Sequence, residues 1–364
     1  MTAVESEIIK LPKGKIRSIL GSPEKSAKAV NLVYVNQADL GVKRIKQGTE
    51  FYYLGANNKK VKDSSTLKRI KQLVIPPAWE DVWICALENG HLQATGIDSK
   101  KRKQYKYHDL WNALRNHTKF YRLLQFSAAI PAIRLQVEKD IELPGLPVEK
   151  VLALAVSLME RTNIRVGNNE YERLYGSIGL TTLKDKHVSI EGNEMKFSFK
   201  GKKGIQHEIS IKNKKLARIV KACRDIPGKE LFQYYSTEGV KKSIDSGMVN
   251  SYIKKVSGCD FTAKDFRTWS GTIHAFLAFK SLGGFETDTE GKKKINAALA
   301  LVANHLGNTS NVCKKYYVHP AIISLYENKI LEKYFKDLDH IGINDDMAGL
   351  TSEEKMVVKI LEKT

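Results

Sequence analysis

The stretch HVSIEGNEMKFSFKGKKGIQHEISIK, residues 187–212, decides the fold class of this chain. It contains two turn signals, Gly192-Asn193 and the FKGKKG segment at 199–204, and apolar residues alternate with polar ones around them. Alternation with a period of two is typical of a strand that buries one face, and short turns of this kind join neighbouring strands. We therefore predict a three-stranded sheet over this stretch.

Helical patterns surround the predicted sheet. The segments VEKVLALAVSLMERT (148–162), GTIHAFLAFKSL (271–282) and KKKINAALALVANHL (292–306) each repeat apolar residues at the period of an amphipathic helix. We expect residues 114–364 to form a mainly helical domain that contains the sheet.

The chain before this domain has a different character. Residues 1–30 mix Lys, Ser, Gly and Pro without periodicity, so we expect a leader or flexible arm. Residues 31–113 indicate a small strand-rich domain, in which VWICALENGHLQATGID (82–98) predicts a hairpin around Asn89-Gly90 and STLKRIKQLV (65–74) predicts a helix. The predicted fold class is α+β, with a small β-rich N-terminal domain and a larger, mainly helical one.

The totals of the 364-residue chain limit its class. Hydrophobic residues make up 42%, which is enough for two domain cores and excludes a wholly disordered chain. There are 60 lysines and arginines against 40 acidic residues, and the formal charge of +20 favours nucleic acid as a partner over an anionic membrane surface. The sequence has no apolar run of about 18 residues and no signal-peptide pattern, so we expect a soluble protein that is not exported.

The four cysteines, Cys85, Cys223, Cys259 and Cys313, are scattered along the chain. They lack the CxxC spacing of a zinc site or the clustering of a disulfide framework. Buried, reduced thiols are the expected state, and they fit a cytoplasmic protein. No cluster of carboxylates that could hold a metal is evident.

Basic residues gather in four places. The segment DSKKRKQYKYHDLW (98–111) interleaves basic side chains with Gln104, Tyr105 and Tyr107, which suits contacts to phosphates and base edges. The three shorter clusters are Arg165 at the end of a helix that runs out at Gly167, Lys202 or Lys203 in the turn at 199–204, and Lys264 with Arg267 just ahead of an apolar helix. Each cluster has an ordinary alternative, such as a solvated loop or a cation that offsets a helix dipole.

Two adjacent tyrosines follow two lysines in CKKYYVHPAI (313–322). A phenol with an ordinary pKa of about 10 is a poor nucleophile, and it becomes useful only where fixed cations surround it and its target. The chain supplies such a set of groups, namely two arginines, one or two lysines and a phenol, and it is suited to binding nucleic acid.

Four blocks of the sequence, in their order and spacing, resemble the type IB DNA topoisomerases, and most of all their poxvirus-like and bacterial branch. These blocks are IRVGNNEYERLYGSIGLTTLKDKHV (164–188), FKGKKG (199–204), AKDFRTW (263–269) and LGNTSNVCKKYY (306–317). In addition, VIPPAWEDVWICALENGHLQATGIDSKKRKQYKYH (74–108) is similar to the N-terminal DNA clamp of that branch. The resemblance covers residues 30–335 and implies a C-shaped clamp that closes around duplex DNA.

Carried over position by position, the resemblance implies a set of catalytic residues. Tyr317 would be the nucleophile, because the family's tyrosine stands nine residues after the polar residue that follows "LG". Tyr316 would pack instead. Arg165 and Arg267 would stabilise the phosphate in the transition state, and Lys202 would be the general acid.

The polar residue that follows "LG" departs from the family. Here it is Asn308, where many relatives carry histidine. An amide can donate a hydrogen bond to a phosphate oxygen, but it cannot carry a proton or a charge. We do not expect His305 to substitute for it, because His305 lies three residues earlier on another helix face. The resemblance further implies DNA contacts by Lys103, Gln104, Tyr105, Tyr107, Tyr171 and Lys264.

The reaction that the resemblance implies is relaxation of supercoiled DNA. One strand would be cleaved through a 3′-phosphotyrosyl link and then religated, without ATP, a metal or another cofactor. The protein would act as a monomer on double-stranded DNA, away from membranes, in the cytoplasm and associated with the nucleoid. Two alternatives stay open: a tyrosine site-specific recombinase, which usually has histidine at the position of Lys264, and a DNA-binding protein without catalytic activity.

Overall fold

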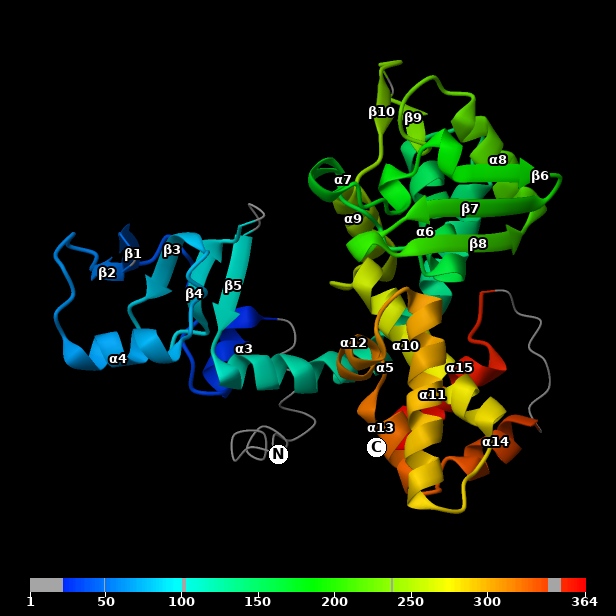
Figure 1. Ribbon diagram of the computed structural model, residues 1–364. Coiled ribbons are helices and arrows are strands. Elements are labelled where there is room, and N and C mark those ends of the chain that lie inside the picture. The colour runs from blue at the N-terminus through cyan, green and yellow to red at the C-terminus, as the bar shows by residue number, and fades with distance from the viewer. Residues whose placement is uncertain (1–21, 49, 100–102, 237, 340–347) are drawn as a thin grey trace. The chain divides into compact units, whose positions relative to one another are not determined.

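The computed structural model of the chain describes residues 22–48, 50–99, 103–236, 238–339 and 348–364. The chain divides into two compact units, Met1–Tyr121 and Arg122–Thr364 (Figure 1). The division falls inside the long helix α5 (Asp109–Ile141). Among the helices of the described residues, none is both long enough and apolar enough to cross a membrane.

The first unit is built on an antiparallel sheet with the strand order β2-β1-β3-β4-β5. Its strands are β1 (Gly41–Gln47), β2 (Glu50–Leu54), β3 (Glu80–Cys85), β4 (Leu92–Ile97) and β5 (Lys103–Tyr107). Helix α4 (Ser64–Gln72) begins at the cap residue Asp63, whose carboxylate accepts a hydrogen bond of 2.7 Å from Thr66 N. Ile70 of this helix packs in one cluster with Val82 of the sheet.

The hairpin predicted within 82–98 is confirmed, although its connection is longer than the two residues Asn89-Gly90. Strand β3 pairs antiparallel with β4, and residues 86–91 connect them. Neither Asn89 nor Gly90 has the positive φ of a two-residue hairpin turn. Gly90 is needed for close packing instead, because a Cβ there would lie 2.5 Å from Cys85 Sγ.

The N-terminal arm is a partial correction. The structure shows helix α3 (Pro23–Ala29), capped by Ser22, so the prediction of a leader or flexible arm over 1–30 is wrong for its last residues. Ala27 and Val30 are buried in a cluster with Trp111, which explains why this short segment is ordered. Residues 1–21 lie outside the described residues.

In the second unit, the predicted three-stranded sheet is confirmed. Its antiparallel strands, in the order β6-β7-β8, are β6 (Val188–Glu191), β7 (Glu194–Lys200) and β8 (Gln206–Lys212). Gly192 has a φ of +59° in the first turn, a conformation that glycine adopts at no steric cost. Met195, Phe197 and Phe199 are buried in alternation along β7. This apolar face belongs to the main core, to which α8 (Lys214–Arg224) also contributes.

Helix α6 (Val148–Thr162) has the predicted bounds but not the predicted amphipathic character. All its residues from Val151 to Met159 are buried, including the polar Ser157. A helix buried all round is one that other elements enclose, and α6 contacts β8, α9 (Ser246–Ser257) and α10 (Ala263–Leu282).

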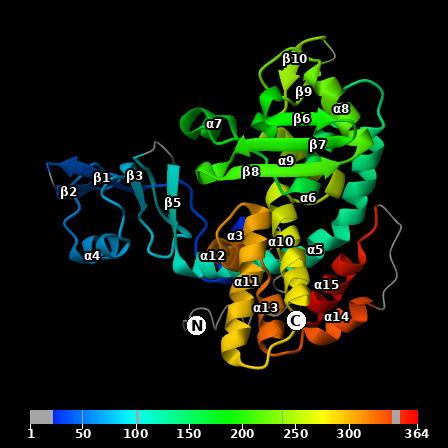
Figure 2. The same ribbon diagram turned by 45° about the vertical axis from the view of Figure 1, so that its right-hand side comes forward.

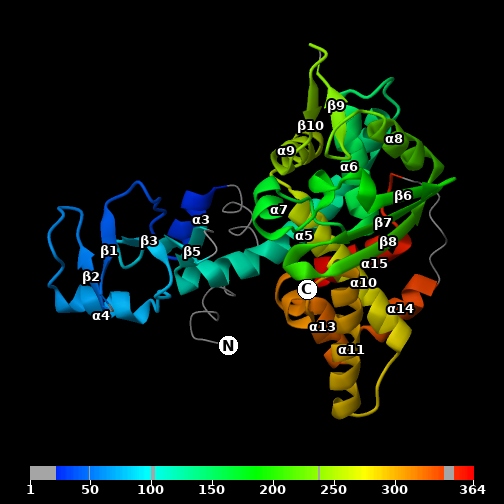
Figure 3. The same ribbon diagram turned by 45° about the horizontal axis from the view of Figure 1, so that its top comes forward.

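The other helices form the rest of the second unit. Helix α11 runs beside α10, and α12 packs against α11 (Figures 1 and 2). Helix α15 packs against α10 and α14 (Figure 3), where Glu354 accepts hydrogen bonds from Trp269 Nε1 at 2.9 Å and from both terminal nitrogens of Arg134. The bounds of the elements not yet given are α7 (Asn169–Tyr175), β9 (Gln233–Tyr235), β10 (Lys241–Ser243), α11 (Asp288–Leu306), α12 (Ser310–Tyr316), α13 (Pro320–Glu327), α14 (Glu332–Asp339) and α15 (Ser352–Lys363), with short 3-10 turns η1 (Leu180–Thr182), η2 (Asp185–His187) and η3 (Lys202–Gly204).

The fold is therefore mixed helix and sheet, with a small N-terminal sheet and a larger, mainly helical unit. This agrees with the α+β prediction, whereas the C-shaped clamp stays a prediction.

Candidate active site

Arg267 lies at the centre of the predicted catalytic residues. It belongs to the second turn of α10, which begins at the cap Thr262, so the prediction that Arg267 lies just ahead of the helix is wrong. Its side chain is 5% exposed. Nη1 donates to Asn163 O, and Nη2 donates to Leu306 O at 2.7 Å. The guanidinium thereby joins the loop after α6 to the end of α11.

Arg165 lies in that loop and not at a helix end, which corrects the sequence interpretation. Helix α6 ends at Thr162, and Asn163 takes the left-handed conformation that closes it. Arg165 Nη2 donates to Gly307 O at 2.8 Å and to Asn308 Oδ1 at 2.6 Å. Arg165 and Arg267 thus converge on the backbone between α11 and α12 from two different elements.

The two guanidinium groups are held by oxygens of the main chain and of Asn308. Within the part of the chain that the structure describes, no carboxylate forms an ion pair with Arg165 or Arg267. Burial, and then the positive charge of Arg267, lowers the pKa of Arg165 to about 10. Buried charges are normally paired, so this pair of cations is suited to receive an anion.

Asn308 adds a further donor at the same place. Its Oδ1 faces Arg165, while its Nδ2 is buried and has no hydrogen-bond partner among the described residues. Arg267 Nε is buried without a partner there in the same way. Buried donors of this kind are rare in proteins, and here they accompany two cations.

Tyr317 lies beside Arg267. The guanidinium carbon of Arg267 is 5.3 Å from the centre of the Tyr317 ring. The main chain of Tyr317 runs close to α10: Thr272 Oγ1 donates to Tyr317 O at 3.3 Å, and a Cβ at Gly271 would lie 2.7 Å from the same oxygen. Only glycine at position 271 allows this close approach, which fixes the place of the tyrosine.

The prediction that Tyr316 packs is wrong. Tyr316 is 38% exposed, and Lys315 Nζ lies over its ring at 5.4 Å. Tyr317 is the partly buried one and packs against the core. Helix α12 ends at Tyr316, so the 100° step between successive helical residues does not describe Tyr317, whose φ is −128°.

Lys202 begins η3 in the turn between β7 and β8, and its side chain is exposed. The turn closes through Gly201 N, which donates to Ile205 O at 2.8 Å. Lys203 has a φ of +63° in the same turn.

His207, which sequence reasoning did not single out, connects this turn with the arginines. Its ring stacks on Phe199 at 5.0 Å, and its pKa is lowered by burial, by Arg165 and by Arg267. One signal could have found it: His207 occupies the same phase of strand β8 as the apolar residues Ile209 and Ile211, where a strand buries its side chains.

His305 also has a place near the site. Its Nε2 lies 2.8 Å from Asn163 Nδ2, and its ring centre lies 3.6 Å from that of His274. The contact with Asn163 links His305 to the residue whose carbonyl holds Arg267.

The predicted DNA-contacting residues lie in both units. In the second unit, Tyr171 on α7 is 46% exposed, and Lys264 at the start of α10 is exposed. In the first unit the others share strand β5, namely Lys103, Gln104, Tyr105 and Tyr107. Residues 100–102 of the basic segment lie outside the described residues.

The residues of β5 contact one another. The rings of Tyr105 and Tyr107 stack at 6.1 Å, and Lys103 Nζ lies 5.8 Å from the Tyr105 ring. Tyr105 is 50% exposed, whereas Tyr107 is half-buried. Gln104 Nε2 donates to Asp98 Oδ2 at 2.8 Å.

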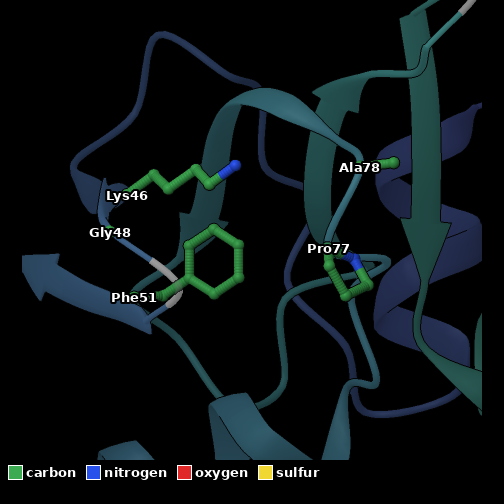
Figure 4. Close-up of a pocket in the computed structure, with 5 residues that line it drawn as sticks. All are labelled: Lys46, Gly48, Phe51, Pro77 and Ala78. Carbon is green, nitrogen blue, oxygen red and sulfur yellow. The ribbon is translucent and has the colours of Figure 1, made fainter.

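A hollow in the first unit does not involve any of these residues. It has a volume of about 410 Å³ and is lined by Lys46, Gly48, Phe51, Pro77 and Ala78 (Figure 4). Among the described residues, no three His, Cys, Asp or Glu side chains are grouped as metal ligands would be.

Comparison with known proteins identifies the family. Residues 99–340 match the family described as "Eukaryotic DNA topoisomerase I, catalytic core", and residues 50–98 match "Bacterial DNA topoisomerase IB, N-terminal domain". The chain therefore belongs to the type IB DNA topoisomerase family and is a type IB topoisomerase, which confirms the resemblance.

Its relatives include proteins named DNA topoisomerase 1B from two viruses. The chain is 34% identical over 295 residues to that of Acanthamoeba polyphaga mimivirus, covering 79% of this chain and 88% of the relative. It is 25% identical over 254 residues to that of Vaccinia virus (strain Copenhagen), covering 69% of this chain and 77% of the relative.

Proposed function

We propose that this topoisomerase relaxes supercoiled duplex DNA by transient cleavage of one strand through a 3′-phosphotyrosyl intermediate at Tyr317, without ATP or a metal. The observation that carries the proposal is the pair of arginines, the half-buried Arg165 and the buried Arg267. Among the described residues they have no carboxylate partner, and they lie beside Tyr317 and the Asn308 amide, whose Nδ2 has no partner there. Such a group of cations and donors is complementary to a phosphodiester.

The bond changes balance without another reactant. Tyr317 Oη releases its proton to water, attacks a backbone phosphorus and forms a P–O bond. The bond from phosphorus to the 5′-oxygen breaks, Lys202 donates a proton to that oxygen, and Lys202 then regains a proton from water. The free 5′-hydroxyl end can then rotate around the intact strand. Its attack on the phosphotyrosine reverses each step, so the energy of the cleaved bond is kept in the intermediate.

The arginines supply most of the stabilisation in this scheme. Guanidinium groups match phosphate oxygens with planar, paired donors, and donors fixed before the reaction cost no reorganisation when charge develops on the phosphorane. Asn308 Nδ2 would donate to a phosphate oxygen as a neutral group.

We propose double-stranded DNA as the partner and a single chain as the active form, acting where the cell's DNA lies, in association with the nucleoid. The charge of +20 supports a polyanionic partner. The exposed Lys103, Tyr105, Tyr171 and Lys264 offer cations and aromatic rings of the kind that contact phosphates and sugars.

Relaxation of supercoiled plasmid with EDTA present and ATP absent tests the proposal. The wild-type protein should relax the plasmid, Tyr317→Phe should lose all relaxation, and the matched control Tyr316→Phe should keep it. Binding without relaxation by the wild type would indicate a DNA-binding protein, and joined products between two duplexes would indicate a recombinase. Either result would refute the proposed activity.

A further inference from the structure

His207 lies between two segments that carry different parts of the site. A Cβ at Gly201, next to Lys202, would lie 2.7 Å from His207 Cδ2 and 2.8 Å from its Nε2. A Cβ at Gly307, next to Asn308, would lie within 3.0 Å of His207 Nε2. Both glycines therefore present bare backbone to the same imidazole, which fills the space between the two segments.

The orientation of this ring is fixed from the strand side. His207 on β8 is the direct cross-strand partner of Phe199 on β7. The two rings stack at 5.0 Å with an angle of 15° between their planes, and Phe199 is buried. A ring that rests on a buried aromatic residue and touches two backbones has little freedom to move.

We propose that His207 is a positioning residue that holds the turn carrying Lys202 against the Gly307–Asn308 segment, and so places the lysine to protonate the leaving 5′-oxygen. This inference rests on the proposed cleavage reaction. Gly307 O and Asn308 Oδ1 are also the acceptors for Arg165. The imidazole therefore sets the spacing between the general acid and the arginine pocket, and it does so by its shape.

Two substrates with different leaving groups can distinguish an effect of His207 on general acid catalysis from a general loss of structure. The probe is a duplex cleaved in a single turnover, with either oxygen or sulfur at the 5′-bridging position of the scissile phosphate. A thiolate leaves without a proton, so a defect in general acid catalysis disappears with the sulfur substrate. Lys202→Ala serves as the reference for such a defect, and Lys203→Ala and His187→Ala serve as controls in the same unit.

His207→Ala should slow cleavage of the oxygen substrate about 10- to 100-fold, a part of what general acid catalysis supplies. It should cleave the sulfur substrate within about threefold of the wild-type rate, as Lys202→Ala should. His207→Phe keeps the ring and its stacking on Phe199, so it should stay within about threefold of wild type on both substrates.

The contact with Gly201 gives an independent test that does not need His207→Ala to fold well. Gly201 has a φ of −89°, so alanine suits its backbone and only the imidazole obstructs the added Cβ. Gly201→Ala should slow cleavage of the oxygen substrate alone in a chain that keeps His207. In His207→Ala, the same change should cause no further loss, a non-additivity that reports direct contact.

Three results would overturn the inference while the proposed function stands. These are wild-type rates for His207→Ala on both substrates, an equal loss on both substrates, or a loss for His207→Phe as large as that for His207→Ala. A wild-type protein that does not cleave the oxygen substrate would overturn the proposed function, and the inference with it.

Discussion

At the scale of single residues, the site depends on two arginines that form no ion pair with a carboxylate of the described residues. Arg165 Nη2 donates to Gly307 O and Asn308 Oδ1, and Arg267 donates to Asn163 O and Leu306 O. Asn308 Nδ2 has no hydrogen-bond partner among the described residues. A carboxylate at this place would satisfy the cations but would exclude a phosphate. Asn308 satisfies one arginine donor and leaves the positive charge of the pocket intact.

Asn308→Asp should have opposite effects on the stability of the chain and on its activity. The new carboxylate would lie at the position of Oδ1, 2.6 Å from Arg165 Nη2, and would pair with it. We expect a higher midpoint of thermal unfolding, together with single-turnover cleavage that is slower by about 10²-fold or more, because the carboxylate repels the phosphate and Nδ2 is lost. Asn308→His is the matched control and should retain cleavage. An aspartate variant as active as wild type would contradict the account.

At the scale of secondary-structure elements, sequence patterns predicted the strands and helices in which apolar residues repeat regularly. The alternation of residues 187–212 predicted the sheet, and the apolar period of residues 148–162 predicted α6 with its correct ends, although α6 is buried on all sides from Val151 to Met159. The patterns failed where a cap decides the path of the chain. Arg165 follows the left-handed Asn163, and Tyr317 follows the last residue of α12, so the helical period does not apply to either.

The candidate site was predicted from the resemblance of short blocks, and periodicity could not have assembled it. Arg165, Arg267 and Asn308 are far apart in sequence. They come together because α10 and the end of α11 pack against the loop after α6. The phase of His207 with Ile209 and Ile211 predicts that its side chain faces inward, but the sequence does not show that Gly201 and Gly307 are its neighbours.

The α10–α11 contact carries a pair of histidines that should make stability depend on pH. His274 on α10 lies against His305 on α11, and burial, followed by the proximity of His305, lowers the pKa of His274 from 6.5 to about 4. Between these values the unfolded chain binds the proton more tightly. This contribution to stability is therefore fully present above pH 6.5 and is lost as the pH falls towards 4.

The expected result is a decrease in the thermal unfolding midpoint between pH 6.5 and pH 4.5 that is steeper for wild type than for His274→Phe. Leu301→Phe, at an exposed position of α11 without a titratable group, is the control and should follow the wild-type profile. If wild type and His274→Phe have the same pH dependence, protonation of His274 does not contribute to the loss of stability at low pH.

At the scale of the whole molecule, the positive charge of the chain is opposite to that of its proposed partner, duplex DNA. The chain carries a formal charge of +20, and the proposed contacts come from β5 in the first unit and from α7 and α10 in the second. Binding that neutralises many phosphates releases counterions, which makes affinity depend steeply on salt.

We therefore expect duplex affinity to fall by about 10³-fold or more between about 50 mM and 200 mM salt. The measurement uses Tyr317→Phe, so that cleavage does not interfere with the binding equilibrium. Lys103→Ala should reduce the slope of this salt dependence by about one unit, since it removes one phosphate contact. An affinity that hardly changes over this range would contradict binding through contacts to the phosphates of the duplex.

The measurement that tests the central claim most directly is the mapping of the covalent link between protein and DNA. The wild-type protein is incubated with a duplex whose leaving strand is too short to be retained, and the trapped adduct is digested and analysed by mass spectrometry. The account predicts a 3′-phosphate on Tyr317 and release of a strand with a 5′-hydroxyl, with no adduct in Tyr317→Phe. A link to Tyr316, a link through a 5′-phosphate, or no covalent adduct at all would contradict it.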